Sequence, residues 1–275
     1  MVVCIRNVSG RRKMKVYILN NGWLEYDGSV MMPLSSLTMQ KIKGWKNTWM
    51  KIPVFAILID HPAGKIVYDL SCDPNTMGEF WPFDLIPYYR IENPSFLKQL
   101  ALTGTRPKDV KMVILSHWHF DPESNLSAFH HADFYIHNKP LGLQQETDFL
   151  PAGCNAYGSQ AGDDKGITVK YLGEEIRELI PGVEAVTVYH HNSGFLGVML
   201  CLKKQGTLLF LQDVMYLRRY YHPPGKALGK VYETWILFDL VRRIQQYAKQ
   251  KNAKAMFYDD VNFSLQTEIT PRLYE

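Results

Sequence analysis

Hydrophobic residues in this chain gather in short, strand-length runs, and several of these runs lie in pairs around a turn. Two such pairs predict β-hairpins, because proline or glycine at the turn interrupts the strand pattern. Their runs are residues 54–59 and 65–69 around Asp60-His61-Pro62-Ala63-Gly64, and residues 195–202 and 207–211 around Gln205-Gly206. The regular pattern begins with a strand at 15–19, so residues 1–13 are predicted to be an N-terminal extension.

Segments with helical spacing separate the hairpins. Asn93 and Pro94 predict the start of a helix, and Gly104 predicts its end. Its apolar stripe consists of Phe96, Leu97, Leu100 and Leu102. A second, amphipathic helix is predicted at 231–250, and short apolar strands are predicted at 110–115, 185–190 and 255–258. Hairpins alternating with helices favour one α/β domain in which two sheets pack face to face with helices outside.

Composition and charge narrow the class of protein. Of 275 residues, 46% are hydrophobic and 21% charged, which supports a sizeable core and rules out a disordered chain. The 31 basic and 27 acidic residues leave a net charge of +4, so no nucleic-acid partner is expected. No apolar run approaches the ~20 residues that span a bilayer, so no membrane partner is expected. The four cysteines form no CxxC pair, which favours reduced thiols and a cytoplasmic location.

The segment with the clearest chemistry is Ser116-His117-Trp118-His119-Phe120-Asp121-Pro122, directly after the apolar run 110–115. Because alternate residues leaving a strand point the same way, His117 and His119 are predicted to face one cleft, with Asp121 beside them. Two imidazoles so placed suit Zn²⁺, which prefers nitrogen and sulfur ligands at about 2.0–2.3 Å. By contrast, His130-His131 and His137 occur in a polar turn and a strand, where surface or packing roles are expected.

Three more strand ends carry candidate metal ligands, which are His191 after 185–190, Asp213 after 207–211, and Asp259 after the last strand. The order His-x-His-x-Asp, then His, then Asp at a strand end resembles the metallo-β-lactamase superfamily. Within it, the chain is similar to the lactonase branch, which includes the N-acyl-homoserine lactonases and 4-pyridoxolactonase. The resemblance implies an αββα sandwich of two mixed β-sheets flanked by helices, with the hydrolase domain at 14–275.

The resemblance covers residues 15–275, and the matching segments keep the order that they have in the family. These segments are Lys15 to Gly22 with Asp27-Gly28, similar to the opening of 4-pyridoxolactonase; Asp69-Leu70-Ser71, where the family has Asp-Thr-Gly; Pro181-Gly182-Val183 before the third histidine; and Asp213-Val214-Met215-Tyr216, similar to the lactonases' Asp-x-x-Tyr. In that branch the tyrosine contacts the lactone, which implies the same contact for Tyr216.

Two departures from the family pattern change the expected metal content. The family's His-x-His-x-Asp-His ends here in Pro122, whose side chain cannot bind a metal, and the family's final histidine falls at Asp259. The Thr-Pro-Gly-His before the third ligand reads Val188-Tyr189-His190-His191. His191 is therefore assigned by alignment, with His190 as a near competitor.

The resemblance implies one intact and one damaged metal site. The intact site consists of His117, His119 and His191, with Asp213 bridging to the second site, which retains Asp121 and has Asp259 in place of a histidine. We therefore expect about one zinc per chain, with an open fourth position. The alternative is a second metal (Zn, Mn or Fe). An all-carboxylate second site would suit a hard ion such as Mn²⁺ or Mg²⁺.

The activity implied is hydrolysis of a lactone or related small ester by metal-bound hydroxide. Asp121 is assigned to orient the water and exchange its proton, and Tyr216 to hydrogen-bond the developing oxyanion. Arg218-Arg219, just after Tyr216, suits an anionic substrate or, equally, a solvated loop. Dimers are usual among the relatives, which makes a homodimer one expectation.

Three other classes of function stay open. The damaged second site suits a binding protein on this fold that has lost catalysis. A hydrolase of another ester or a phosphoester is compatible with the same scaffold, since one fold hosts many chemistries, although the low net charge argues against a nuclease. An iron-based redox protein is less favoured, because nothing downstream indicates a flavin-binding partner domain.

Overall fold

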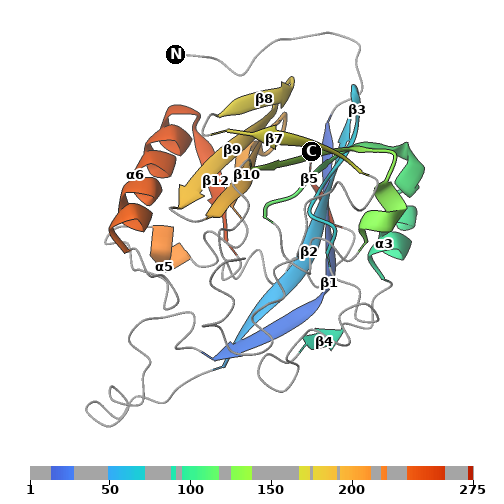
Figure 1. Ribbon diagram of the computed structural model, residues 1–275, viewed down its shortest axis with the longest axis horizontal. Coiled ribbons are helices and arrows are strands. Elements are labelled where there is room, and N and C mark those ends of the chain that lie inside the picture. The colour runs from blue at the N-terminus through green and yellow to red at the C-terminus, as the bar shows by residue number, and fades with distance from the viewer. Residues whose placement is uncertain are drawn as a thin grey trace.

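The computed structural model describes residues 14–27, 49–71, 88–90, 95–117, 125–137, 167–173, 176–190, 193–211, 218–221, 234–257 and 272–274. These residues form two β-sheets that pack face to face, with helices on the outer sides (Figure 1). The predicted αββα sandwich of two mixed sheets is confirmed.

The first sheet contains eight strands within the described residues. They are β1 (Lys15–Asp27), β2 (Trp49–His61), β3 (Gly64–Tyr68), β4 (Tyr88–Arg90), β5 (Val110–Ile114), β6 (Asp133–His137), β7 (Thr168–Leu172) and β13 (Arg272–Tyr274). Their order is β13-β1-β2-β3-β5-β6-β7, with β4 paired to β1. The strands from β13 to β3 pair antiparallel, whereas β3, β5, β6 and β7 pair in parallel. The carboxyl ends of these parallel strands therefore meet at one edge of the sheet.

The second sheet has the strand order β12-β11-β10-β9-β8. Its strands are β8 (Arg177–Ile180), β9 (Val183–His190), β10 (Ser193–Leu202), β11 (Gly206–Phe210) and β12 (Ala253–Met256). Both β9 and β11 pair antiparallel with β10, and β12 pairs in parallel with β11. It follows that β9, β11 and β12 run in one direction and end at the same edge, which is also the edge at which β10 begins.

The helices cover the outer faces of the two sheets (Figure 1). They are α3 (Phe96–Leu102), α5 (Arg218–Tyr221) and α6 (Thr234–Gln250), with 3₁₀ turns η1 (Pro107–Asp109) and η2 (Leu126–Phe129). Helix α6 packs on β9 and β12, and α3 packs beside β1. No helix in the described ranges is long and apolar enough to cross a membrane.

Strand β2 shows how one sequence pattern builds two cores. Phe55, Ile57 and Ile59 face the second sheet, whereas Ala56 and Leu58 face the layer under α3. The alternation follows from the two-residue period of a strand, because successive side chains point to opposite faces. Burying each large apolar side chain contributes about 1.5–3 kcal/mol, so both faces of the strand stabilise the sandwich.

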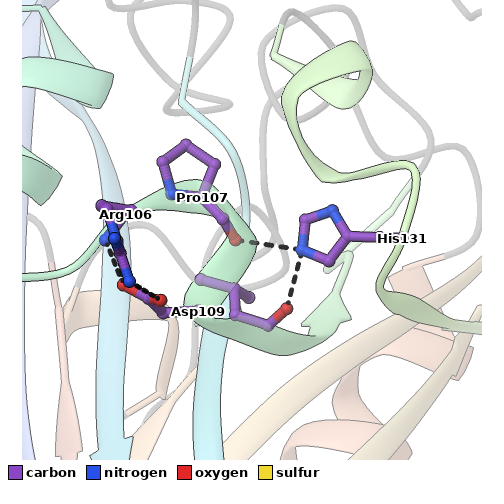
Figure 2. A network of polar contacts seen from close by, with 5 residues as sticks. Arg106, Pro107, Asp109 and His131 are labelled. Carbon is purple, nitrogen blue, oxygen red and sulfur yellow. Dashed lines mark hydrogen bonds and ion pairs between the residues drawn. The ribbon is translucent and has the colours of Figure 1, made fainter.

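A small polar network fixes the entry to β5 (Figure 2). The backbone N–H and the guanidinium of Arg106 donate to the Asp109 carboxylate at 2.9–3.1 Å. Nε2 of His131 lies 3.1 Å from the carbonyl oxygens of Pro107 and Val110. Because carbonyl oxygens only accept, Nε2 carries the proton and donates to both. His131 thus links the start of β5 to the turn before β6 while it stays exposed, which agrees with the surface or packing role expected for it.

Two expectations about local structure need correction. Helix α3 begins at Phe96 with Ser95 as its N-cap, rather than at Asn93 and Pro94, which lie outside the described residues. Its predicted end is confirmed, because Gly104 follows with a φ of 76°, a conformation that glycine adopts without a steric penalty. The last strand of the first sheet, β13, was not predicted.

The expectation of reduced thiols is wrong for Cys201. This residue, near the end of β10, is disulfide-bonded. The spacing of cysteines along the sequence carries little information about which of them meet in a sandwich with many crossovers.

Candidate functional site

The site is built at the edge where β3 and β5 end and β10 begins. Strand β5 lies between β3 and β6, and the chain leaves it through Leu115 and Ser116 to His117. The His117 side chain is buried, with a relative exposure of 5%. Its position was predicted from the apolar run before it, and the structure places it directly after that buried strand.

Ser116 is held by hydrogen bonds from both sheets. Its backbone N–H donates to Oδ1 of Asp69 at 2.6 Å, and its carbonyl oxygen accepts from the N–H of Leu196 at 2.7 Å. Asp69 follows β3 in the first sheet, whereas Leu196 belongs to β10 in the second. The peptide that carries His117 is therefore anchored to both layers of the sandwich.

The imidazole of His117 is oriented by its own neighbours. Its Nδ1 lies 2.8 Å from Oγ of Ser116, and its ring centroid lies 5.0 Å from that of Phe195, with the planes tilted by 39°. On the same strand, the Leu196 carbonyl accepts a hydrogen bond from the buried Tyr68 hydroxyl at 2.7 Å. Strand β10 thus contacts both the end of β3 and the residue that begins the metal motif.

The turn after β3 has an unusual backbone. Asp69 and Ser71 both have a left-handed φ, at 58° and 57°. Asparagine and aspartate tolerate this region, but for serine it carries strain. Ser71 stands where the resembling family has glycine, the residue that adopts this φ without a steric penalty. Between them, the Leu70 carbonyl accepts a hydrogen bond from Nδ2 of Asn125 at 2.8 Å. The turn is therefore fixed despite its strain, and it presents the Asp69 carboxylate to Ser116.

Of the predicted site residues, His117 alone lies within the described ranges. His119, Asp121, Pro122, His191, Asp213, Tyr216 and Asp259 lie outside them. The strand ends before these residues are described, however. β9 ends at His190, β11 is followed by Leu211, and β12 is followed by Phe257. All three ends lie at the edge of the second sheet where β10 begins, and β10 contacts Ser116 there.

The described part of the chain contains no cluster of three or more potential ligands from His, Cys, Asp and Glu. His117 itself fits the role of a metal ligand, because it is buried, sits at a convergence of strand ends and has one ring nitrogen against a hydroxyl. A ligating imidazole is commonly oriented through its second nitrogen in this way. His137, at the end of β6, is also buried, which agrees with the packing role expected for it.

Sequence reasoning missed the residues that orient His117. The sequence motif includes Ser116 but assigns it no role. The family resemblance includes Asp69 but does not indicate that its carboxylate accepts a hydrogen bond from Ser116. The two are 47 residues apart, so their contact depends on the pairing of β3 with β5. The one available signal was the position of Asp69 at the end of a strand.

Arg218 has a defined neighbour near the rim of this edge. Its guanidinium carbon lies 5.6 Å from the ring centroid of Phe257, and the Tyr221 ring packs against the same phenylalanine at 5.2 Å. Phe257 directly follows β12 and precedes Asp259 by two residues. Arg218 is therefore exposed, as a solvated loop would have it, but its guanidinium also lies over the buried ring of Phe257.

Comparison with known proteins gives consistent matches. A model of the metallo-beta-lactamase superfamily matches residues 50–121. N-acyl homoserine lactonase AiiB of Agrobacterium fabrum is 25% identical over 95% of this chain and 99% of its own length. The AiiB of Rhizobium rhizogenes is 26% identical with the same coverage.

Solved structures show the same fold. An N-acyl homoserine lactone hydrolase, with the product N-hexanoyl-L-homoserine at its catalytic metal centre, superimposes with a TM-score of 0.71 at 16% identity, covering 95% of this chain and 99% of that one. AidC, described as a dizinc quorum-quenching lactonase, gives 0.59 at 16% identity, covering 90% and 88%. With the two-sheet fold and the ordered motif, these matches show that the chain is similar to the metallo-β-lactamase superfamily and, within it, to the N-acyl homoserine lactonases.

Proposed function

We propose that this protein is a metal-dependent hydrolase that opens a lactone or a related small ester. The similarity to N-acyl homoserine lactonases over nearly the whole chain supports this reaction class. The observation that carries the proposal is the anchoring of His117 at the edge where three strand ends of the second sheet converge. Each of those ends leads, within three residues, to a further candidate ligand in the sequence.

The proposed metal content is one zinc ion. It would be held by His117, His119 and His191, with Asp213 beside them. Histidines and a carboxylate are suitable zinc ligands, and the orientation of His117 fits such a site. Pro122 and Asp259 argue against an ordinary second site, although one structural neighbour is described as dizinc. A second metal (Zn, Mn or Fe) that uses Asp121, Asp213 and Asp259 is the alternative.

The chain's own residues divide the rest of the work. When bound, zinc supplies a Lewis acid and lowers the pKa of a coordinated water to about 7. Asp121 orients the attacking water, accepts its proton and returns that proton to the departing alkoxide. The Tyr216 hydroxyl donates a hydrogen bond to the carbonyl oxygen as negative charge develops there. With one metal, the leaving alkoxide depends on Asp121, so slower turnover than in a two-metal relative is expected.

The proposed partner is a small-molecule lactone or ester, with a homodimer as the proposed assembly and the cytoplasm as the proposed location. The disulfide at Cys201 weighs against that location, because cytosolic thiols are kept reduced. Counting free thiols in protein purified with a thiol-blocking agent shows whether Cys201 is reduced, as a cytoplasmic location requires, or disulfide-bonded.

The function is tested by assaying purified, zinc-loaded protein against N-acyl homoserine lactones of different chain length, simple aryl esters and phosphodiesters. We expect lactone hydrolysis that a chelator abolishes and zinc restores, and its loss in His117→Ala. The Tyr216→Phe variant should lose activity without a matching loss of stability. Lactone turnover that is insensitive to the chelator and unchanged in His117→Ala would sink the proposal.

A second candidate is a binding protein that has lost catalysis. Pro122 and Asp259 favour it, because they remove imidazole or ligating capacity at the second metal. It predicts no metal-dependent turnover with any compound in the same panel, and tolerance of His117→Ala. The same assay therefore separates the two candidates.

A further inference from the structure

Two hydrogen bonds hold the backbone of Ser116 independently of the contact that its hydroxyl makes with His117. Its N–H donates to Asp69 at 2.6 Å and its carbonyl accepts from Leu196 at 2.7 Å. Its side chain is almost completely buried. On this held backbone the buried side chain places Oγ 2.8 Å from Nδ1 of His117. The hydroxyl can therefore either accept a hydrogen bond from Nδ1 or donate one to it.

The contact distinguishes the two tautomers of a neutral imidazole. If Nδ1 of His117 carries the proton, it donates to Ser116 Oγ, and the lone pair that a metal requires lies on Nε2. If Nε2 carries the proton, Ser116 donates to Nδ1 and occupies that lone pair. The first arrangement alone leaves a nitrogen lone pair directed away from Ser116. Metal-binding histidines commonly donate their other N–H to such an acceptor, which fixes the tautomer and the ring orientation.

We propose that Ser116 is a positioning residue for His117. Its hydroxyl accepts a hydrogen bond from Nδ1–H and holds the ring in the tautomer that binds a metal through Nε2. Phe195 assists by packing its ring 5.0 Å from the imidazole, which restricts rotation. This inference rests on the proposed metal site, and it adds a residue outside the predicted ligand set.

Ser71 provides a matched control. It is also buried, with 2% exposure, and it follows β3, the strand beside β5. Its hydroxyl has no hydrogen-bond partner in the structure as described, so Ser71→Ala removes a buried serine hydroxyl that does not orient a histidine. Ser116→Ala removes one that does. The pair separates loss of a buried hydroxyl in general from loss of the contact with His117.

The first readout is the tautomer of His117 in the full-length, metal-free chain, labelled with ¹⁵N-histidine. Long-range ¹H–¹⁵N correlation spectra report which ring nitrogen carries the proton, and His117→Gln assigns the resonances. We expect the proton on Nδ1 in the wild type, Ser71→Ala and Ser116→Thr, which keeps the hydroxyl. In Ser116→Ala we expect the Nε2–H form or a mixture.

The second readout is zinc affinity, measured by competition with a chromophoric chelator. Loss of a hydrogen-bond partner of a ligand costs roughly 10–100-fold in metal affinity, so Ser116→Ala should weaken zinc binding by that factor. Ser116→Thr should restore most of it, and Ser71→Ala should match the wild type. An Nε2–H tautomer in the wild type, or equal affinity in Ser116→Ala, overturns the role of Ser116. A wild type with the Nδ1–H tautomer that binds no zinc instead overturns the metal-site proposal.

Discussion

The carboxylate of Asp69 accepts a hydrogen bond from the backbone N–H of Ser116 at 2.6 Å, joining the end of β3 to the end of β5. In return, the Asp69 N–H donates to the Ile114 carbonyl at 2.9 Å, which extends the ladder between the two strands. Asp69 is buried and has a φ of 58°. Its side chain therefore continues the strand pairing at the point where the backbone must turn.

Replacing Asp69 by alanine should destabilise the protein by about 1.5–3 kcal/mol, the usual contribution of a hydrogen bond to a charged group. The left-handed φ adds to the cost, because alanine is less tolerant of it than aspartate. Asp69→Asn keeps an acceptor and tolerates the same φ, so it should cost less. Urea unfolding measures both. The control is Asp133→Ala, which breaks an exposed ion pair with Lys170 and should cost at most about 1 kcal/mol. Equal losses at Asp69 and Asp133 would contradict the account.

Tyr68→Phe should destabilise the protein by about 1–3 kcal/mol, because it leaves the buried Leu196 carbonyl without the hydroxyl that donates to it at 2.7 Å. The matched control is Tyr135→Phe, whose hydroxyl makes a long, exposed contact of 3.5 Å with Lys170. That variant should stay within about 0.5 kcal/mol of the wild type. Urea midpoints for the two variants measure the difference. If Tyr68→Phe were as stable as Tyr135→Phe, the bond between β3 and β10 would not contribute to the sandwich.

The packing of α6 on β9 should weaken at alkaline pH. Burial, together with the hydrogen bond that Tyr247 donates to Glu184, raises the pKa of Tyr247 to about 12. Lys251 also donates to Glu184, at 2.7 Å. Since the folded-state pKa lies above its ordinary value, the stabilisation is complete below about pH 10 and is lost as pH rises toward 12. The free energy of unfolding of the wild type should therefore fall more steeply over this range than that of Tyr247→Phe. Parallel curves would be the contrary result.

The turn between β2 and β3 should make stability sensitive to mild acid. Burial lowers the pKa of His61, although the Pro181 carbonyl and nearby Asp60 act in the opposite direction. Nε2 lies 3.0 Å from the Pro181 carbonyl, and Nδ1 accepts from the Ala63 N–H at 3.0 Å. Protonation of Nδ1 removes that acceptor. With a lowered folded-state pKa, the stabilisation is present above the ordinary value of about 6.5 and is lost as pH falls through the folded value.

The measurement is thermal unfolding of the wild type and His61→Gln between neutral and mildly acidic pH. The wild type should lose more stability than the variant on acidification. Because the remaining carboxylates and histidines titrate in both proteins, the difference between the curves isolates His61. A constant difference across this range would mean that His61 does not titrate in the folded state as the contacts require.

Much of the fold follows from local pattern. Strand β5 and the hairpin of β10 and β11 were predicted because their apolar runs are bounded by turn residues, and such signals lie within a few residues of one another. Strand β13 was missed because it has three residues and pairs with β1, at the opposite end of the chain. Helix α3 begins later than predicted, after Ser95, whose side chain makes no capping hydrogen bond; a capping residue type in the sequence therefore does not by itself fix where a helix begins.

For the candidate site, the sequence predicts where His117 lies, but it does not predict the residues that orient its side chain. The place of His117 was predictable because it directly follows an apolar run of strand length. Its environment was not, since Asp69, Leu196 and Phe195 reach it through strand register and through the packing of one sheet on the other. Cys201 shows the same limit, because a disulfide depends on which strands meet rather than on cysteine spacing.

Metal content per chain tests the central claim most directly. Mass spectrometry should be applied to protein purified without added metal, and again after loading with zinc or manganese and removal of excess, with His117→Ala as the control. We expect about one zinc per chain in the wild type and loss of that zinc in the variant. Two metals would contradict the one-zinc proposal and restore Asp259 as a ligand of a second site. No metal under either condition would contradict the hydrolase account and favour the binding protein.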